Sequence, residues 1–90
     1  MSSQYYEGVG RRKESTARVR LMSGNGKFTV NDRPVEEYFP RTGDMEAILG
    51  PLSATEQDRA TYDITVSVRG GGVSGQTDSV QLGLARALVK

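Results

Sequence analysis

The sequence of 90 residues contains no cysteine, no histidine and no tryptophan. The absence of cysteine excludes disulfides and thiolate metal sites. The absence of histidine removes the commonest metal ligand and the usual general base. Hydrolases and metalloenzymes therefore lose most of the side chains that they commonly use, and we expect no enzymatic activity, no metal and no cofactor.

Long hydrophobic runs are also missing. No apolar segment approaches the roughly 18 residues of a transmembrane helix, and the N-terminal residues 1–5 lack the apolar core of a secretory signal. We therefore expect a cytoplasmic protein with no membrane contact. The hydrophobic content of 36% suits one small domain, which we place over residues 1–90.

The charged residues are unevenly distributed, although the net charge is only +1. Residues 1–33 carry seven Lys or Arg against three acidic residues, whereas residues 34–63 carry two Arg against seven acidic residues. Residues 64–90 are again weakly basic. This segregation indicates a basic face for a polyanion and an acidic face turned to solvent or to a basic partner.

Alternating apolar residues predict four strands, near residues 4–9, 15–22, 27–30 and 63–69. We expect the second and third strands to pair as a hairpin across a Gly-rich turn. Short helices are predicted at 35–39 and at 44–49, the latter ended by Gly50 and Pro51. Tyr38 and Phe39 could form a platform for a base, but the pattern favours a place in the core.

The segment from Asp63 to Gln76 is a strand followed by glycines and then by a helix that begins near Val73. Unpaired amides at such a helix start can bind an anion. The spacing Gly70-x-Gly72-x-x-Gly75 satisfies a dinucleotide fingerprint, but the second parallel strand is missing. A P-loop would need a Lys where Gln76 stands. Alternatively, the glycines only let the helix pack closely on the sheet.

The last helix has several further positions of interest. Ser74 is a candidate N-cap. Gly83 destabilises the helix by about 1 kcal/mol relative to Ala, which indicates that close packing requires a glycine there. Arg86 and Lys90 form a basic edge, which suits either the helix C-terminus or a polyanion. Because glycine is costly inside a helix, we expect Gly83 to pack closely against the sheet.

Near the N-terminus, Arg11, Arg12 and Lys13 are three adjacent cations. They repel one another and add nothing to a core, so they belong on a surface where a negative partner offsets the repulsion. Gly8 and Gly10 precede them, and a backbone without Cβ atoms can approach a phosphate closely. A solvated basic turn is the plainer alternative.

Two motifs carry a specific resemblance. The segment Gly8-Val9-Gly10-Arg11-Arg12-Lys13-x-Ser15-x-Ala17-Arg18-Val19 and the segment Gly70-Gly71-Gly72-Val73-Ser74-Gly75-Gln76 strongly resemble the small-subunit ribosomal protein S nine family. The resemblance continues to the closing Gly83-x-Ala85-Arg86-Ala87-Leu88 and covers nearly the whole chain.

The resemblance implies an α+β fold, a two-layer sandwich in which helices cover one face of a mixed sheet of about four strands. It also implies a left-handed βαβ crossover like that of ribosomal protein S five domain two. Spacing alone would predict the usual right-handed connection.

The resemblance further implies a structural role in the head of the small ribosomal subunit, supporting translation by binding ribosomal RNA beside neighbouring head proteins. The implied RNA contacts are Gly8, Gly10, Arg11, Arg12, Lys13, Arg18, Arg20, Arg69, Gly70, Gly71, Gly72, Ser74, Gln76 and Arg86. These positions agree with the charge distribution.

Two departures from the family pattern stand out. The family usually has a basic residue and a His around Gln81 and Leu82, and it carries a long basic C-terminal extension that reaches the transfer RNA. Since the chain stops at Lys90, we expect a truncated core whose transfer RNA contact is missing. Exposed strand edges would favour self-association of such a core.

Two other function classes remain as alternatives. One is a nucleotide-binding enzyme that uses the loop from Gly70 to Gly75. The other is a protein-interaction module whose acidic middle segment docks a basic neighbour.

Overall fold

The structure is a computed structural model that describes residues 5–55 and 59–89. In chain order its elements are β1 (Tyr5–Arg12), β2 (Ser15–Ser23), β3 (Phe28–Val30), β4 (Arg33–Pro34), α1 (Val35–Tyr38), α2 (Thr42–Ala54), the 3-10 turn η1 (Arg59–Thr61), β5 (Tyr62–Arg69) and α3 (Val73–Leu88). Gln4 of the first predicted strand lies outside the described residues.

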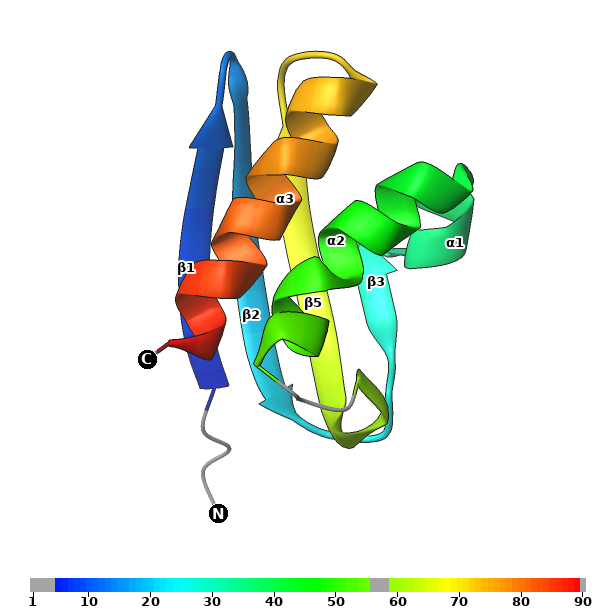
Figure 1. Ribbon diagram of the computed structural model, residues 1–90, viewed down its shortest axis with the longest axis vertical. Helices are drawn as coiled ribbons and strands as arrows, with labels where there is room; N and C mark the ends of the chain where they lie inside the picture. Colours follow the sequence, from blue (N-terminus) through cyan, green and yellow to red (C-terminus); the bar gives the residue numbers. More distant parts are fainter. Residues whose placement is uncertain (1–4, 56–58, 90) are drawn as a thin grey trace.

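The strands form one mixed sheet in the order β1-β2-β5-β3-β4, with β3 and β5 parallel and the other neighbours antiparallel. The helices cover one face of this sheet (Figure 1). The α+β class and the mixed sheet with helices on one face are confirmed. The sheet has five strands rather than about four, because the two residues of β4 are too few to show an alternating pattern.

The predicted hairpin between the second and third strands is wrong. Strand β5 lies between β2 and β3 and pairs with both. Its alternate residues Ile64, Val66 and Val68 are buried, which suits the central position. Turn chemistry indicates where a chain reverses, but it does not show that a later strand will enter between the two arms.

Helix α2 is longer than predicted, since it runs through Gly50 and Pro51 to Ala54. Proline removes only its own N–H donor, and the chain continues helically because Thr55 N donates to the carbonyl of Pro51. Ile48 and Leu52, on either side of the expected end, are both buried in the core. Tertiary packing therefore overrides the local stop signal.

Helix α3 lies directly against β1 and β2, as Figure 1 shows. The approach is close because glycines face one another. A Cβ on Gly8 or Gly10 would meet the backbone of α3, and a Cβ on Gly83 would come within 2.8 Å of Val19 Cγ2. The predicted close packing at Gly83 is confirmed.

The start of α3 differs from the prediction. The N-cap is Gly72, and Ser74 lies exposed in the first turn without capping the helix. The core below is built from apolar residues of the strands and of all three helices, and Phe39 is buried in it as expected. Among the described residues, no helix is both long and apolar enough to cross a membrane.

Candidate nucleic-acid interface

The two motifs singled out in the sequence meet at one end of the sheet. The turn between β1 and β2 packs on the loop between β5 and α3, both at the top of Figure 1. A Cβ on Gly70 would meet the carbonyl oxygen of Glu14, and one on Gly71 would lie 3.2 Å from Ser15 Cβ. Gly70 and Gly71 also have left-handed φ angles of 81° and 68°, which favour glycine. We call this region the hairpin end.

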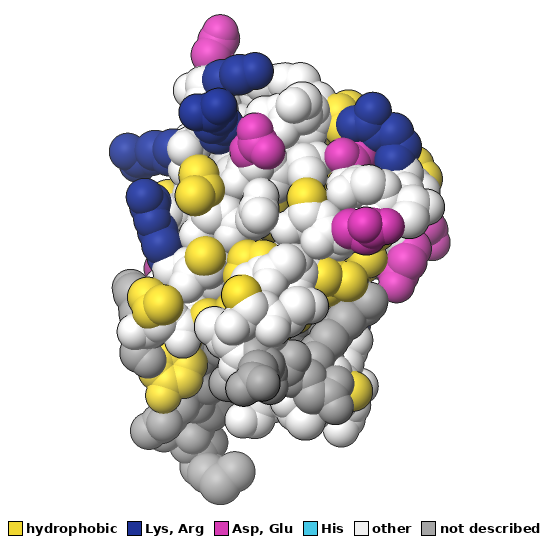
Figure 2. Space-filling view, in the orientation of Figure 1, with side chains coloured by type: hydrophobic (Ala, Val, Ile, Leu, Met, Phe, Trp, Pro, Cys, Tyr) yellow, Lys and Arg dark blue, Asp and Glu magenta, His cyan; other side chains and the backbone are white. Residues whose placement is uncertain are grey.

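Four of the predicted contacts, Arg11, Arg12, Lys13 and Arg69, are exposed at the hairpin end. Figure 2 shows most of the visible dark blue side chains near the turn between β1 and β2, with a smaller dark blue group on the side of α1 and α2, where most of the magenta side chains lie. Acidic residues also occur at the hairpin end, where Glu14 is exposed and Asp78 lies beside Arg12, so cations predominate there without being the sole charges. A basic end of this kind attracts a polyanion.

One cation at the hairpin end has an ionic partner. Arg12 Nε lies 3.6 Å from Asp78 Oδ2 in the first half of α3. The two side chains are 58% and 41% exposed, so the pair contributes at most about 1 kcal/mol. Water competes for both groups, and the guanidinium remains available to a phosphate.

Arg18 and Arg20 lie on the sheet face that α3 does not cover. Both approach Glu7 of β1, with Arg18 Nη1 3.7 Å from Oε1 and Arg20 Nε 3.1 Å from Oε2. The guanidinium of Arg20 also lies 5.3 Å from the centre of the Tyr5 ring. These contacts hold the two cations in place on the uncovered face.

Gly8 and Gly10 are buried beneath α3, which corrects the prediction that they approach a phosphate. Their missing Cβ atoms make room for the backbone of the helix. A polyanion on the surface cannot reach them, so we leave both out of the interface.

Gln76 has a structural role that its sequence position did not reveal. Tyr38 Oη donates to Gln76 Oε1 at 2.9 Å, and Gln76 Nε2 donates to the carbonyl of Gly70 at 3.2 Å. The side chain of Gln76 therefore links the Gly-rich loop to α1. We infer that it shapes the loop, and we do not count it as a direct contact.

Asn31 extends this network. Its Oδ1 accepts from Val68 N and its Nδ2 donates to Val68 O, both at 3.0 Å, so the side chain continues the pairing along β5. Nδ2 is also 3.3 Å from Tyr38 Oη. The φ angle of Asn31 is 50°, in the left-handed region that Asn adopts more readily than most residues. The sequence marks only a turn here, because nothing local shows which strand will lie alongside.

The remaining predicted contacts lie around α3. Gly72 and Ser74 are exposed, and a Cβ on Gly72 would meet no atom within 4 Å. The guanidinium of Arg86 donates to the carbonyl of Val9 and ties the helix to the edge of the sheet. Arg86 stays exposed, so this bond leaves other donors of its guanidinium at the surface.

A buried pair of hydroxyls fixes the hairpin end. Ser15 Oγ and Ser79 Oγ are 2.9 Å apart, and both residues are almost fully buried. Ser79 Oγ also donates to the carbonyl of Gln76 at 3.0 Å. Each buried hydroxyl is thus satisfied, and the first residue of β2 is joined to α3.

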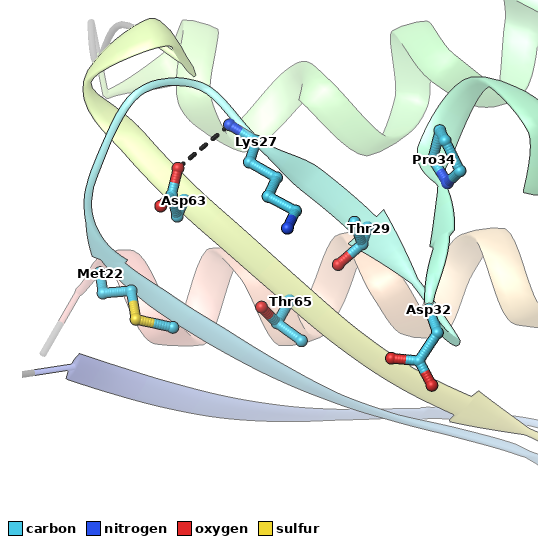
Figure 3. Close-up of a pocket in the computed structure, with 7 residues that line it drawn as sticks. All are labelled: Met22, Lys27, Thr29, Asp32, Pro34, Asp63 and Thr65. Atoms are coloured by element: carbon cyan, nitrogen blue, oxygen red, sulfur yellow. Dashed lines mark hydrogen bonds between the residues drawn. The ribbon is translucent and has the colours of Figure 1, made fainter.

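The uncovered face beside β3 and β4 has a different character, from Asp63 at the end opposite the hairpin end to Asp32 in the turn after β3. A hollow of about 540 Å³ is lined by Met22, Lys27, Thr29, Asp32, Pro34, Asp63 and Thr65 (Figure 3). One ammonium group faces two carboxylates there, which disfavours a phosphate. No group of three potential metal-ligating side chains occurs among the described residues.

Asp63 organises the turn at this end. Its Oδ1 accepts the amides of Asn25 at 3.0 Å and of Lys27 at 3.1 Å. These hydrogen bonds, the one from Asn25 first, lower the pKa of the carboxyl group below its ordinary value of 3.8. Asp63 is therefore a structural carboxylate, ionised at neutral pH.

Comparison with known proteins agrees with this geometry. The family model described as "Ribosomal protein S9/S16" matches residues 10–90. The "Small ribosomal subunit protein uS9" of Solidesulfovibrio magneticus is 47% identical over 88 residues, which cover 98% of this chain and 67% of that protein. The chain belongs to the ribosomal protein S9/S16 family.

Proposed function

We propose that the chain is a structural component of the small ribosomal subunit, not an enzyme, and that it binds ribosomal RNA through the hairpin end. Family membership carries the ribosomal role and, with it, a place in the cytoplasm. The observation that supports this binding site is the meeting of the basic turn with the Gly-rich loop, although Glu14 and Gly70 are 56 positions apart in the sequence.

The chemistry of the hairpin end suits the RNA backbone. Guanidinium and ammonium groups contact phosphates, and the exposed Gly72 leaves its backbone open to close approach. Such contacts position a protein without reading a base sequence, and each releases counterions. The affinity should therefore fall steeply as the salt concentration rises.

A second surface of the protein is acidic and suits a neighbouring protein of the subunit. The exposed acidic residues Glu37 and Glu46 lie on α1 and α2, where Figure 2 shows a group of magenta side chains to the right of the hairpin end. This side would face a basic ribosomal protein, while the hairpin end faces RNA. Both contacts can form at once.

We also propose a single domain with a left-handed crossover. One core contains residues from the strands and from all three helices. In Figure 1 the chain leaves β3, passes through α1 and α2 in front of the sheet, and returns to the left as β5, with both strands running upward. This path supports the crossover implied by the family resemblance.

The RNA site can be tested with Arg12→Ala combined with Lys13→Ala. We expect the affinity for a small-subunit RNA fragment to fall about 10-fold or more at low salt. The slope of log K against log salt should become shallower by about 0.7–0.9 for each phosphate that the variant no longer neutralises. Fluorescence anisotropy titrations at several salt concentrations measure both quantities.

The matched control is Arg33→Ala combined with Arg41→Ala, which removes two exposed cations from the edge strand β4 and the start of α2, outside the hairpin end. It should change the affinity by less than about 3-fold, the small effect expected of the change in net charge alone. Equal losses in the two variants would show that only net charge matters and would overturn the assigned site.

A further inference from the structure

The uncovered sheet face is ordered in rows, because the strand register aligns residues of β1, β2 and β5. From the hairpin end downward the rows are Arg11-Thr16-Arg69, Val9-Arg18-Ser67, Glu7-Arg20-Thr65 and Tyr5-Met22-Asp63. The contacts of Glu7 and Tyr5 with Arg18 and Arg20 show that these β1 residues share the face.

The formal charge of the rows falls steadily along the face. It is +2 in the first row, +1 in the second, zero in the third and −1 in the fourth. The rows lie about 6.7 Å apart, since each step is two residues of an extended strand. A polyanion is therefore attracted to the first two rows. The third row is neutral, and in the fourth row the carboxylate of Asp63 is partly offset by Lys27, directly before the neighbouring strand β3.

Two hollows lie where the face is positive. One of about 370 Å³ is lined by Thr16, Arg18, Ser67 and Arg69. A second, of about 280 Å³, is lined by Arg18, Arg20, Thr65 and Ser67. Because Arg18 and Ser67 line both, the hollows adjoin and form one shallow trough with hydroxyl and guanidinium donors.

We propose that the hollow between Arg18 and Arg69 binds a backbone phosphate of an RNA strand that continues from the hairpin end onto the uncovered sheet face. The hydroxyls of Thr16 and Ser67 donate to the same phosphate. The inference rests on the proposed RNA-binding function and extends it to a second surface.

The lining selects the RNA backbone over its bases. Arg presents paired donors that match phosphate oxygens, and the first two rows contain no aromatic ring on which a base could stack. Glu7 marks the limit of the contact. Its carboxylate already occupies the space between Arg18 and Arg20 that a second phosphate would need.

The test changes the charge of the hollow in both directions at Ser67, an exposed strand residue. Ser67→Glu should weaken binding to a small-subunit RNA fragment about 5-fold or more, and Ser67→Lys should strengthen it. A variant that unfolds would bind the RNA less well whichever charge it carries, so unfolding cannot explain weaker binding in one variant and tighter binding in the other. The controls are Ser53→Glu and Ser53→Lys, which make the same changes at an exposed position of α2. Anisotropy titrations at fixed salt measure all four variants.

The outcomes separate this inference from the proposed function. Opposite effects at Ser67 that exceed those at Ser53 support the trough as an RNA contact. Equal effects at the two positions overturn it, while weaker binding by the Arg12 and Lys13 double variant would still support the hairpin end. If that double variant also binds like the unmodified protein, the RNA site at the hairpin end fails as well.

Discussion

Single residues at the two ends of the sheet have contrasting roles. At the hairpin end, Gly70 and Gly71 let two loops pack together, and the cations are exposed to a phosphate, although Arg12 also lies near Asp78. At the other end, Asp63 holds a turn with its carboxylate. The sequence shows the cations plainly because three adjacent positive charges have no place in a core. It does not show the partners of Asp63, since those are amides of a distant turn.

The lowered pKa of Asp63 makes a pH-dependent contribution to stability. A carboxyl group whose folded pKa lies below its unfolded value of 3.8 stabilises the fold above that value, and the contribution is lost as the pH falls through the folded pKa. Asp63→Asn keeps the acceptor oxygen and removes the charge. We expect this variant to be less stable at about pH 5–7, with the gap closing below about pH 4.

Urea unfolding of both proteins across this pH range measures the gap directly. Asp44→Asn is a useful comparison, because Asp44 accepts hydrogen bonds from the side chain of Arg41 and not from backbone amides. A gap between the unmodified protein and Asp63→Asn that stays constant down to pH 2 would contradict the proposed role of the ionised group.

At the scale of elements, the contact of β1 with α3 decides how closely the layers approach. Gly83 could be singled out from the sequence because glycine is costly inside a helix. For Gly8 and Gly10 the sequence predicts contact with a phosphate instead, because an alternating strand does not show which of its faces a helix will cover. For the same reason, the sequence does not predict the hydrogen bond from Arg86 to the carbonyl of Val9.

Gly10→Ala tests this contact. A Cβ at this position would meet the carbonyl of Ser79 and the amide of Gly83, and backbone atoms cannot move aside as a flexible side chain would. We expect a loss of about 2–3 kcal/mol in the free energy of unfolding, at the upper end for overpacking. Chemical denaturation measures it.

Gly43→Ala provides the matched control in α2. An added Cβ there meets no atom within 4 Å, so the substitution should leave the protein unchanged or stabilise it by up to about 1 kcal/mol. If Gly10→Ala were as harmless as Gly43→Ala, the close packing of β1 on α3 would be wrong.

Strand order was the element-scale feature that the sequence did not reveal. The position of β5 between β2 and β3 depends on contacts far apart in the chain. The side chain of Asn31 helps to fix that position by pairing with Val68 beyond the end of β3. A sequence pattern describes one strand at a time, so it cannot supply such a pairing.

At the scale of the whole molecule, stability should be unevenly distributed. Strands β2 and β5 have a neighbour on each side, and their residues Val19 and Val66 are fully or almost fully buried. Helix α1 has only four residues, and Glu36 and Glu37 are exposed. We expect amide hydrogen exchange to be slowest at Val19 and Val66 and much faster at Glu36 and Glu37. NMR-detected hydrogen exchange measures these rates. Amides of Glu36 and Glu37 as well protected as those of Val19 and Val66 would contradict the prediction.

The packing of β1 on α3 also constrains when the protein can fold. Strand β1 leaves the site of synthesis first, but the helix that covers it is completed last among the described elements. Until Gly83 has emerged, the glycines of β1 have no surface to meet, and the apolar side of β2 is exposed as well. The packing of β1 on α3 can therefore form only after α3 has been synthesised, and until then the exposed apolar side of β2 makes the nascent protein prone to aggregation.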